Sequence, residues 1–583
     1  MSSYWKVDDT MRIGQNYVSI PSENGLEYSP EQKIQIFVDP SSKFINGQDS
    51  YLEFNFKIKP PDGSVPTKLA LDKMGGSALI KNIRIYDGSR GRLLEELDSY
   101  SSLVSVRYDY DTDNSVRNVR ALREGSGVHN IANRGTMGTS YSDMANTLTS
   151  PYFKKVSGNQ SATDTWTTSA FLTAKLCIPL HTGIFAQNES IFPIMMTSGL
   201  YIEIDTPPAT EVIKQLDSVL KNRRTKLNPY FHSLNGSTVA PNDWGTGGTA
   251  VSEFYVSTRN NLSGADAVSK FPFVIGETFK FVDDADITVT SNISGTMTIS
   301  EINLSSNGLI QVKLNASVTN NGGGATAITS NGDVMYSTAV EGQSSYDPSY
   351  TISNVNLVLS QVQLDPSYEK GMIQKVREGK NIEIDIMTAT NYKNSILASD
   401  RQTTFQIYAQ NSRAKGLLII PQDASVYSGH EAVCGAGTYQ ILKNEDVDDT
   451  ALFSNRSGYT GCIDELKEIQ YQISGRLVPS RPIDVSKIAS RKSIDAFHLY
   501  ELEKLLDNCG IVPRSFRAFN ENFIFGRGFG VNQGALDLRG RDLAVILKYT
   551  GATAPAKPKL FNSFVFHVRR FLIGGNGNVD VVL

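Results

Sequence analysis

The sequence predicts an all-β dominated fold, built as two antiparallel sandwiches or barrels in succession. Short segments that suit strands recur in both halves of the chain, and turn residues separate them. Few segments show the 3.6-residue spacing of an amphipathic helix. The chain has 583 residues, more than one hydrophobic core usually supports, so we expect at least two large domains.

The first domain is expected to begin after an N-terminal arm over residues 1–30. Residues 32–38 and 51–59 are predicted strands. In the second of these, Leu52 and Phe54 alternate with polar neighbours, which is typical of a strand with one buried face. This half-buried strand is the clearest element of the first domain.

A hairpin is predicted around Asp87 and Gly88. The flanking segments, 78–86 and 92–97, have strand composition, and an Asp-Gly pair readily takes the positive φ values of a tight reversal. The two segments are therefore expected to pair.

Residues 211–222 are predicted to form one of the few helices, because Val212, Ile213 and Leu216 fall on one helical face. From residue 229 to 350 the composition shifts to Ser, Thr, Asn and Gly. Such a segment can form small hairpins but is not expected to fill a large core. We interpret 229–350 as a β-rich surface insertion.

The second domain is expected to repeat the pattern of the first. Strands are predicted at 416–421, 543–549 and 562–573, among others. One clear helix interrupts them, with Ser493 as the N-cap and Gly510 as the residue after its last turn. Strands therefore dominate here too.

The glycine-rich stretch from Gly526 to Tyr549, GRGFGVNQGALDLRGRDLAVILKY, raises the question of a phosphate-binding loop. A dinucleotide fingerprint needs a third glycine where Val531 stands, and a helix after the loop. The segment that follows, 543–549, has the composition of a strand. We therefore predict a turn before a strand, and no cofactor site.

An acidic stretch beginning at Asp109 resembles the start of a calcium loop, because Asp111 and Asp113 follow at the ligand spacing. Arg120 stands where the loop needs a bidentate acid, and Asn114 replaces the turn glycine. A second acidic cluster, Asp446, Asp448 and Asp449, is interpreted as a solvated loop. No metal site is predicted.

No catalytic residues are predicted either. The chain has no nucleophile elbow, zinc-protease or P-loop motif, and its six histidines are scattered: His129, His181, His232, His430, His498 and His567. The four cysteines lie far apart, which fits a reducing compartment better than a disulfide framework: Cys177, Cys434, Cys462 and Cys509. The sequence indicates a protein that is not an enzyme.

Charge and hydropathy exclude two further classes. The formal net charge is −4, and the basic residues are dispersed instead of gathered in an arm, so sequence-specific nucleic-acid binding is not expected. No run of eighteen apolar residues and no signal-peptide pattern is present. We expect neither a membrane-spanning nor a secreted chain.

Several stretches, in their order, resemble the double jelly-roll major capsid proteins of icosahedral double-stranded DNA viruses. The similarity is carried by residues 75–103 (GGSALIKNIRIYDGSRGRLLEELDSYSSL), 175–207, 355–372, 416–421, 473–482, 526–549 and 561–583. Within that family the sequence looks most like the virophage and polinton-like virus capsid proteins. The stretch 229–350 is a long insertion that the shortest members of the family lack. In other members, such insertions often form towers on the outer surface of the capsid.

The resemblance implies two consecutive antiparallel eight-stranded jelly rolls, the first over residues 31–365 with its insertion at 229–350. A linker over 366–380 would lead to the second jelly roll, over 381–583. It implies a homotrimeric capsomer that contacts neighbouring capsomers and penton and minor capsid proteins, in a virion assembled inside the infected cell. It implies no cofactor, and leaves open whether a membrane lies beneath the shell.

A carbohydrate-binding or host-attachment protein is the alternative, since jelly rolls also serve as lectins. That class would need aromatic side chains clustered with carboxylates. The three tryptophans, Trp5, Trp166 and Trp244, are not clustered with acids in the sequence.

Overall fold

The computed structural model describes most of the predicted strand regions and leaves several long connections out. The described residues are 12–59, 69–71, 74–112, 120, 123–125, 159–160, 174–186, 191–215, 229–234, 244, 250–257, 273, 278–283, 293–305, 309–321, 327–329, 332–337, 349–423, 466–485, 496–513, 523–530, 534–551, 554–555, 558–575 and 577–582. Every structural statement below concerns these residues. None of their helices is long and apolar enough to cross a membrane.

The first domain is an eight-position jelly roll made of two packed antiparallel sheets. In chain order its strands are β1 (Arg12–Pro21), β3 (Lys33–Val38), β4 (Phe44–Lys59), β6 (Asn82–Asp87), β7 (Leu93–Asp98), the interrupted strand β9 (Ala174–Pro179) and β10 (Ile191–Pro193), β11 (Leu200–Asp205) and β20 (Ser349–Leu364). One sheet has the order β1-β20-β4-β10, with β9 also on β4, and the other has the order β3-β11-β6-β7. Numbered by their position along the jelly roll, the strands have the order 1-8-3-6 in one sheet and 2-7-4-5 in the other. The chain therefore passes repeatedly from one sheet to the other, as in a jelly roll.

The second domain repeats this topology without exception. Its strands are β21 (Ile382–Ile396), β22 (Gln402–Ile407), β23 (Ala414–Asp423), β24 (Leu466–Ile473), β25 (Arg476–Asp484), β26 (Phe525–Gly528), β27 (Leu543–Tyr549) and β28 (Lys559–Ile573). The sheets run β21-β28-β23-β26 and β22-β27-β24-β25, again 1-8-3-6 and 2-7-4-5, and β29 (Val579–Val582) adds to β28. The double jelly-roll fold predicted from the sequence is therefore confirmed by the strand order of both domains.

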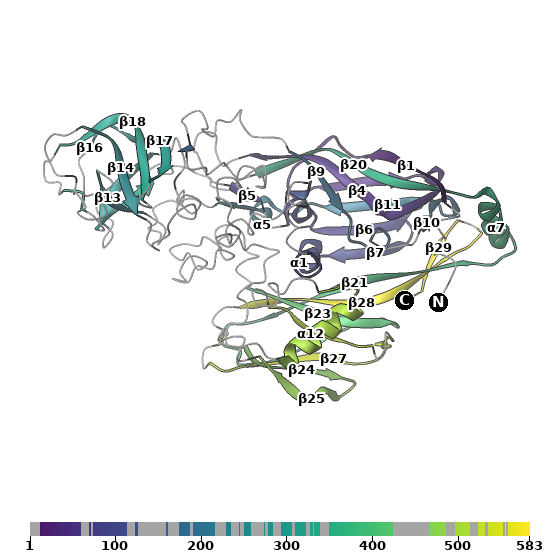
Figure 1. Cartoon of the computed structure of the whole chain (residues 1–583). Helices are drawn as coiled ribbons and strands as arrows, with labels where there is room; N and C mark the ends of the chain where they lie inside the picture. Colours follow the sequence, from purple (N-terminus) through teal and green to yellow (C-terminus); the bar gives the residue numbers. More distant parts are fainter. Residues whose placement is uncertain are drawn as a thin grey trace.

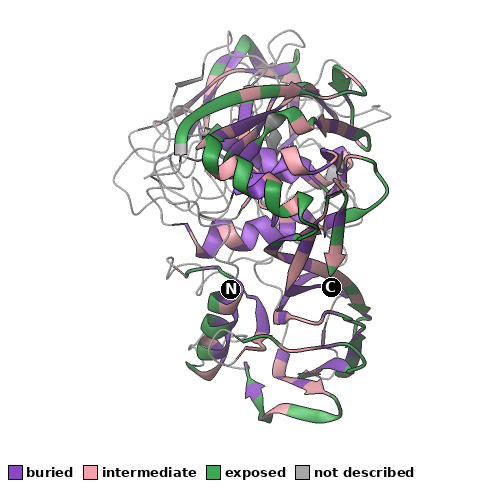
Figure 2. Ribbon diagram, turned by 90° about the vertical axis from the view of Figure 1, so that its right-hand side faces the viewer, coloured by how far each residue is buried: buried purple, intermediate pink, exposed green. Residues whose placement is uncertain are grey.

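In the described part of each jelly roll, a helix follows the fifth strand. In the first domain this is α1 (Tyr100–Tyr110), and in the second it is α12 (Ala496–Asn508). Helix α1 is almost wholly buried at the level where the domains meet, whereas α12 keeps an exposed face on the side of the second sandwich (Figure 2). The α12 packing is close, since a Cβ on Gly526 of β26 would lie 2.5 Å from Leu505 Cδ2.

Smaller elements join these strands. They are β2 (Glu27–Tyr28), which pairs with β20, the 3-10 helices η2 (Pro40–Ser42), η3 (Gly75–Leu79) and η5 (Ile194–Met196), the short pair β5 (Leu69–Leu71) and β12 (Ile213–Gln215), and α5 (Ala209–Val212). Helix α7 (Pro366–Arg377) connects the two jelly rolls, and the Asp365 side chain caps it by accepting from Ser367 N at 2.8 Å.

The insertion is a closed barrel, whereas its sequence composition predicts only small hairpins. Its strands are β13 (Tyr230–Ser233), β14 (Val251–Ser257), β15 (Thr278–Asp283), β17 (Met297–Leu304), β18 (Ile310–Asn320) and β19 (Asp333–Ser337). They pair in the cyclic order β18-β14-β13-β19-β15-β17-β18, and β16 (Ile293–Ser294) and β8 (Asn159–Gln160) attach to β18 and β17. Closure pairs every strand and encloses a core.

The expectation that 229–350 forms small hairpins and does not fill a large core therefore needs correction, because the segment encloses a core of its own. Its average composition conceals apolar residues at alternate positions, and these fill the barrel: Phe231, Phe254, Phe273, Phe279, Phe281, Trp244 and eleven aliphatic or Met residues form one buried cluster. The barrel lies at one end of the first jelly roll (Figure 1).

Two other expectations need correction. Residues 12–21, assigned to the arm, form β1, which pairs with β20 from Arg12 to Pro21. They were missed because an edge strand gains its partner from distant sequence. Of the helix predicted at 211–222, only α5 is observed before β12, whose Ile213 pairs with Leu71. Strand pairing overrides local helical periodicity there. Residues 216–222 lie outside the described part.

Candidate functional site

The two jelly rolls meet along a buried junction, where strand β7 of the first contacts β21 of the second. One apolar cluster crosses it and includes residues from both domains, among them Ile85 and Leu94 of the first, and Ile384, Phe564 and Phe566 of the second. The junction therefore holds the two domains as one packed body.

The junction depends on an interruption in the sixth strand of the first jelly roll. Strands β9 and β10 pair with the same edge of β4, at Tyr51–Phe56 and at Phe44–Asn46. Between them the chain leaves the sheet and passes close to β4 at Gly47, where a Cβ would lie 2.5 Å from Ile184 O. This excursion carries Gly183 to the second domain, where its own Cβ would lie 2.8 Å from Met387 O.

Glu95 links the excursion to the second domain. It lies on β7, is 1% exposed, and accepts from Gly183 N at 2.5 Å, Ile184 N at 3.2 Å and Thr388 Oγ1 of β21 at 2.7 Å. Burial raises the pKa of this carboxyl, while these three hydrogen bonds and the nearby Arg569 oppose the rise. A single acid thus satisfies donors from both domains.

Further polar contacts surround this centre. Arg569 of β28 donates to Leu94 O at 2.5 Å, and Lys393 of β21 pairs with Asp98 at 2.7 Å. At the far end Arg92 pairs with Asp580 of β29, and Ser198 N donates to Gly577 O at 3.0 Å. The contacts extend along the domain boundary, so they restrict rotation of one sandwich against the other.

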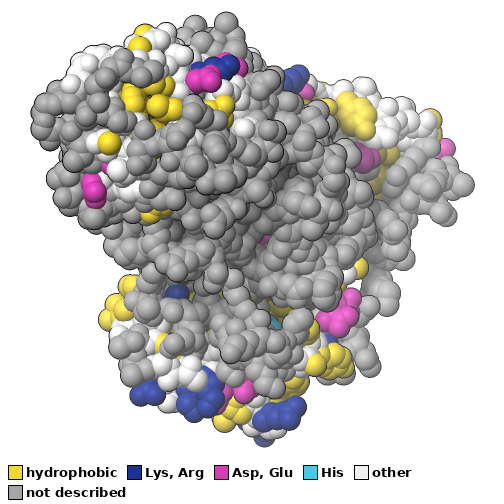
Figure 3. All heavy atoms as spheres, turned by 60° about the vertical axis from the view of Figure 1, so that its left-hand side comes forward, with side chains coloured by type: hydrophobic (Ala, Val, Ile, Leu, Met, Phe, Trp, Pro, Cys, Tyr) yellow, Lys and Arg dark blue, Asp and Glu magenta, His cyan; other side chains and the backbone are white. Residues whose placement is uncertain are grey.

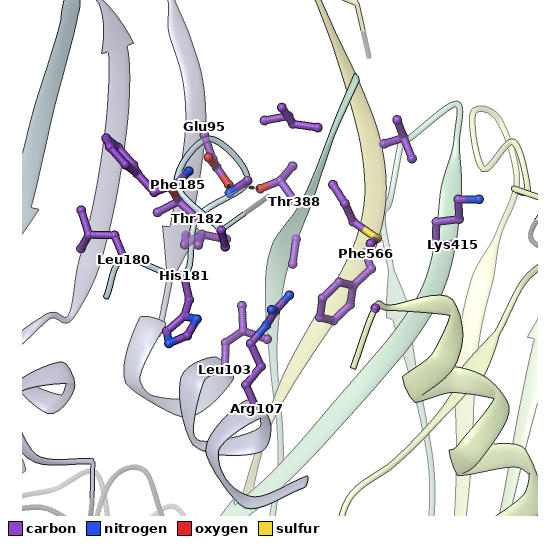
Figure 4. Close-up of a pocket in the computed structure, with 18 of the residues that line it drawn as sticks. Glu95, Leu103, Arg107, Leu180, His181, Thr182, Phe185, Thr388, Lys415 and Phe566 are labelled. Carbon is purple, nitrogen blue, oxygen red and sulfur yellow. Dashed lines mark hydrogen bonds between the residues drawn. The ribbon is translucent and has the colours of Figure 1, made fainter. Parts of the chain in front are cut away.

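A cavity of about 750 Å³ opens within the junction. Its walls come from α1, from the excursion between β9 and β10, and from β7, β21, β23, β28 and the end of α12. Figure 4 shows Glu95 hydrogen-bonded to Thr388 on one side of it, and Arg107 projecting from α1 between the two domains. Signals for this cavity are absent from local sequence patterns, because its walls come from eight separate segments, Gln48 of β4 included.

The described histidines occupy separate places. His181 lies in the excursion at the junction, His232 on β13, His498 on α12 and His567 on β28. Burial lowers the pKa of His567 to about 4, and the ring Nδ1 lies 3.1 Å from Val565 O. The structure does not bring them together, and His129 and His430 fall outside the described part.

The stretches weighed for metal and cofactor chemistry have structural positions. Asp109 is buried in α1, Asp111 caps its end, and Asp113, Asn114 and the cluster at 446–449 lie outside the described residues. Leu543–Tyr549 forms β27, as predicted, but Gly526 and Gly528 belong to strand β26 and not to a turn. Among the described residues, no group of three or more His, Cys, Asp or Glu could hold a metal ion.

The described charges on the face that Figure 3 shows are mixed in sign. Lys and Arg side chains appear along the lower edge, over the second jelly roll, beside acidic and apolar side chains. Trp244 is 2% exposed and lies inside the barrel, while Trp5 and Trp166 fall outside the described part. The best-defined arrangement of side chains in the described part of the chain is thus the junction, which fixes the two jelly rolls relative to one another.

No family model matches the sequence, and no curated protein matches it. Solved structures do match. The capsid model of the virus PBCV-1 is 9% identical with a TM-score of 0.46, covering 99% of this chain and 98% of that one. The Faustovirus major capsid protein is 10% identical with a TM-score of 0.46, covering 98% and 92%, and the Sputnik virophage structure is 10% identical with a TM-score of 0.44, covering 99% and 90%. By its own strand order the chain is a double jelly-roll protein, and these structures are among the solved chains to which it is similar.

Proposed function

We propose that the chain is the major capsid protein of an icosahedral double-stranded DNA virus, and that three copies form one pseudo-hexagonal capsomer. The observation that carries the proposal is the pair of complete jelly rolls with identical strand order, packed side by side through one core. Jelly rolls are common capsid domains. The motifs in residues 75–103 and 526–549 add the sequence resemblance.

The geometry suits a threefold block. In Figure 1 the strands of both sandwiches run along the same long direction, so each chain offers two similar wedges beside one another. Three chains about an axis along that direction would place six wedges in a ring, and closed rotational symmetry limits growth to the trimer. We place the division between the wedges at residues 366–380, where α7 lies.

The molecule also has two different ends. The barrel lies at one end of the long direction, and α7 and β29 lie near the other (Figure 1). With the strands perpendicular to the shell, the barrel would stand on one surface and the α7 end on the other. The proposed orientation puts the barrel outside.

The proposal sets the expected interfaces. A trimer that forms before assembly needs a large interface, above roughly 2,000 Å² in total, and contacts between capsomers can be smaller and more polar. Neighbouring capsomers, pentons and minor capsid proteins are the proposed partners, in a virion assembled inside the host cell. The genome would be held by confinement, given the net charge of −4.

The test is the mass of the purified full chain by light scattering, followed by negative-stain microscopy of the same peak. A species of three chains with a pseudo-hexagonal outline is expected at micromolar concentration. A monodisperse monomer without that outline would overturn the proposal.

A host-attachment role is a second candidate for the barrel alone. Its separate core and its place at one end of the molecule would allow it to present a binding surface without disturbing the jelly rolls. The measurement is glycan-array binding by the full chain and by a chain lacking 229–348. Equal or absent binding by both would remove this candidate.

A further inference from the structure

Arg107 is a partly buried cation at the junction. It lies in the last turn of α1, and Figure 4 shows its side chain directed into the space between the two jelly rolls. Burial lowers the pKa of its guanidinium, but an arginine stays charged at neutral pH. The cavity therefore contains a positive charge that is partly shielded from bulk water.

This charge lacks a direct partner in the described part of the chain. Arg107 Nε is fully buried without a hydrogen bond, and no ion pair within 4.0 Å joins its guanidinium to a described carboxylate. Asp111, one helical turn away, acts on it only at longer range. Shielding a charge from water without a counterion is unfavourable, so a bound anion would stabilise an arginine in this position.

Asp507 of α12 also lines the cavity, and the two remaining acids, Glu95 and Asp385, are already engaged. Glu95 accepts three hydrogen bonds. Asp385 is paired with Arg413 at 3.1 Å and with Arg570 at 2.7 Å. Neither carboxylate could pair with Arg107 without losing these contacts.

A second unsatisfied donor lines the same cavity. His181 has its ring Nε2 buried without a partner, while its backbone N–H donates to Tyr100 Oη at 2.9 Å. Burial and the nearby arginines lower the pKa of His181 well below its ordinary value, so the ring is neutral. A neutral imidazole can still donate one N–H to an anion.

We propose that the junction cavity is a binding site for a small oxyanion, a phosphate or a carboxylate, held by Arg107 with His181 as a further donor. The planar guanidinium suits either group, because both offer two oxygens at its spacing. The bound anion would neutralise the charge of Arg107 on α1, which faces Met387 and Thr388 of the second jelly roll across the cavity. It would so strengthen the junction. This proposal does not depend on the capsid proposal.

The test uses the full chain and inorganic phosphate, with acetate as the carboxylate probe. Isothermal titration calorimetry and thermal unfolding are measured against sodium chloride at matched ionic strength and pH. We expect saturable binding with one site per chain, and a rise in Tm that follows occupancy. Competition of acetate with phosphate would indicate a general oxyanion site, and binding of only one would identify its class.

Arg107→Met should weaken binding at least about tenfold. Arg107→Lys keeps the charge but loses the planar guanidinium, so its affinity for the anion should lie between those of the wild type and Arg107→Met. This variant remains informative if Arg107→Met folds poorly. Lys393→Met is the matched control, because it removes one junction charge outside the cavity and should bind like the wild type. Absence of binding to the wild type, or equal binding by Arg107→Met, would overturn the proposal.

Discussion

The paired jelly rolls and the barrel differ in how sequence order relates to packing. The jelly rolls follow one another along the chain but share one apolar cluster, which includes residues of both domains. The barrel interrupts the first jelly roll in sequence, between β11 and β20, yet it has a cluster of its own. Cooperative units follow buried contacts and not position along the chain, so we expect the jelly-roll pair to unfold as one unit and the barrel as another.

The largest effect is expected for Phe281→Ala. Phe281 is fully buried and packs edge-on against Phe279 at 5.6 Å and Phe231 at 5.5 Å between ring centroids. Removing a buried phenyl ring costs about 3–5 kcal/mol. Differential scanning calorimetry should show the barrel transition lowered and the jelly-roll transition unchanged.

Phe564→Ala is the reciprocal variant. Phe564 is buried on β28 in the shared cluster, so its loss should lower the jelly-roll transition and leave the barrel transition in place. If either variant shifts both transitions equally, the barrel and the jelly rolls unfold as one cooperative unit. That result would contradict their separate unfolding.

Gly183→Ala tests the excursion that joins the domains. Its Cβ would lie 2.8 Å from Met387 O and 2.9 Å from Ile386 Cδ1, so either the excursion or β21 must move. We expect a loss of about 1–3 kcal/mol in urea unfolding, as for other overpacked sites. Gly371→Ala in α7 is the control, because nothing lies within 4 Å of its Cβ and alanine favours a helix. Equal effects of the two substitutions would contradict a tight junction.

Glu95→Gln tests how the junction depends on pH. Because burial raises the pKa of Glu95, the folded protein holds this proton more tightly than the unfolded chain does. Its stabilising contribution is complete below the ordinary value of 4.5 and is lost as pH rises through the raised value. The free energy of unfolding of the wild type, minus that of Glu95→Gln, should therefore fall as pH rises above 4.5. A difference that rises over this range would show that the carboxylate is stabilised as an anion.

The elements that the sequence predicted well are those with local determinants. Strand 51–59 lies within β4, the hairpin at Asp87 and Gly88 joins β6 to β7, and the helix ending before Gly510 is α12. Each has its own alternation, turn residues or helical face. Local patterns decide such elements before any tertiary contact forms.

The elements that the sequence missed depend on distant partners. Strand β1 is polar enough to look like an arm, and becomes a strand through β20, more than 300 residues away. Barrel closure depends on the pairing of β17 with β18 and of β13 with β19, which no single segment reveals. Glu95 stands in an ordinary run, LLEELD, and only the fold shows that it binds Gly183 and Thr388.

The smallest effect is expected for the exposed edge of the junction. Lys393 Nζ and Asp98 Oδ2 are 2.7 Å apart, but the side chains are 43% and 30% exposed. Water and salt screen such a pair, so Lys393→Met should cost only about 0.2–1 kcal/mol, and less at high salt. A double-mutant cycle with Asp98→Asn, followed by urea unfolding, measures the coupling directly. A coupling as large as the effect of Gly183→Ala would show that the rim, and not the buried centre around Glu95, holds the two jelly rolls together.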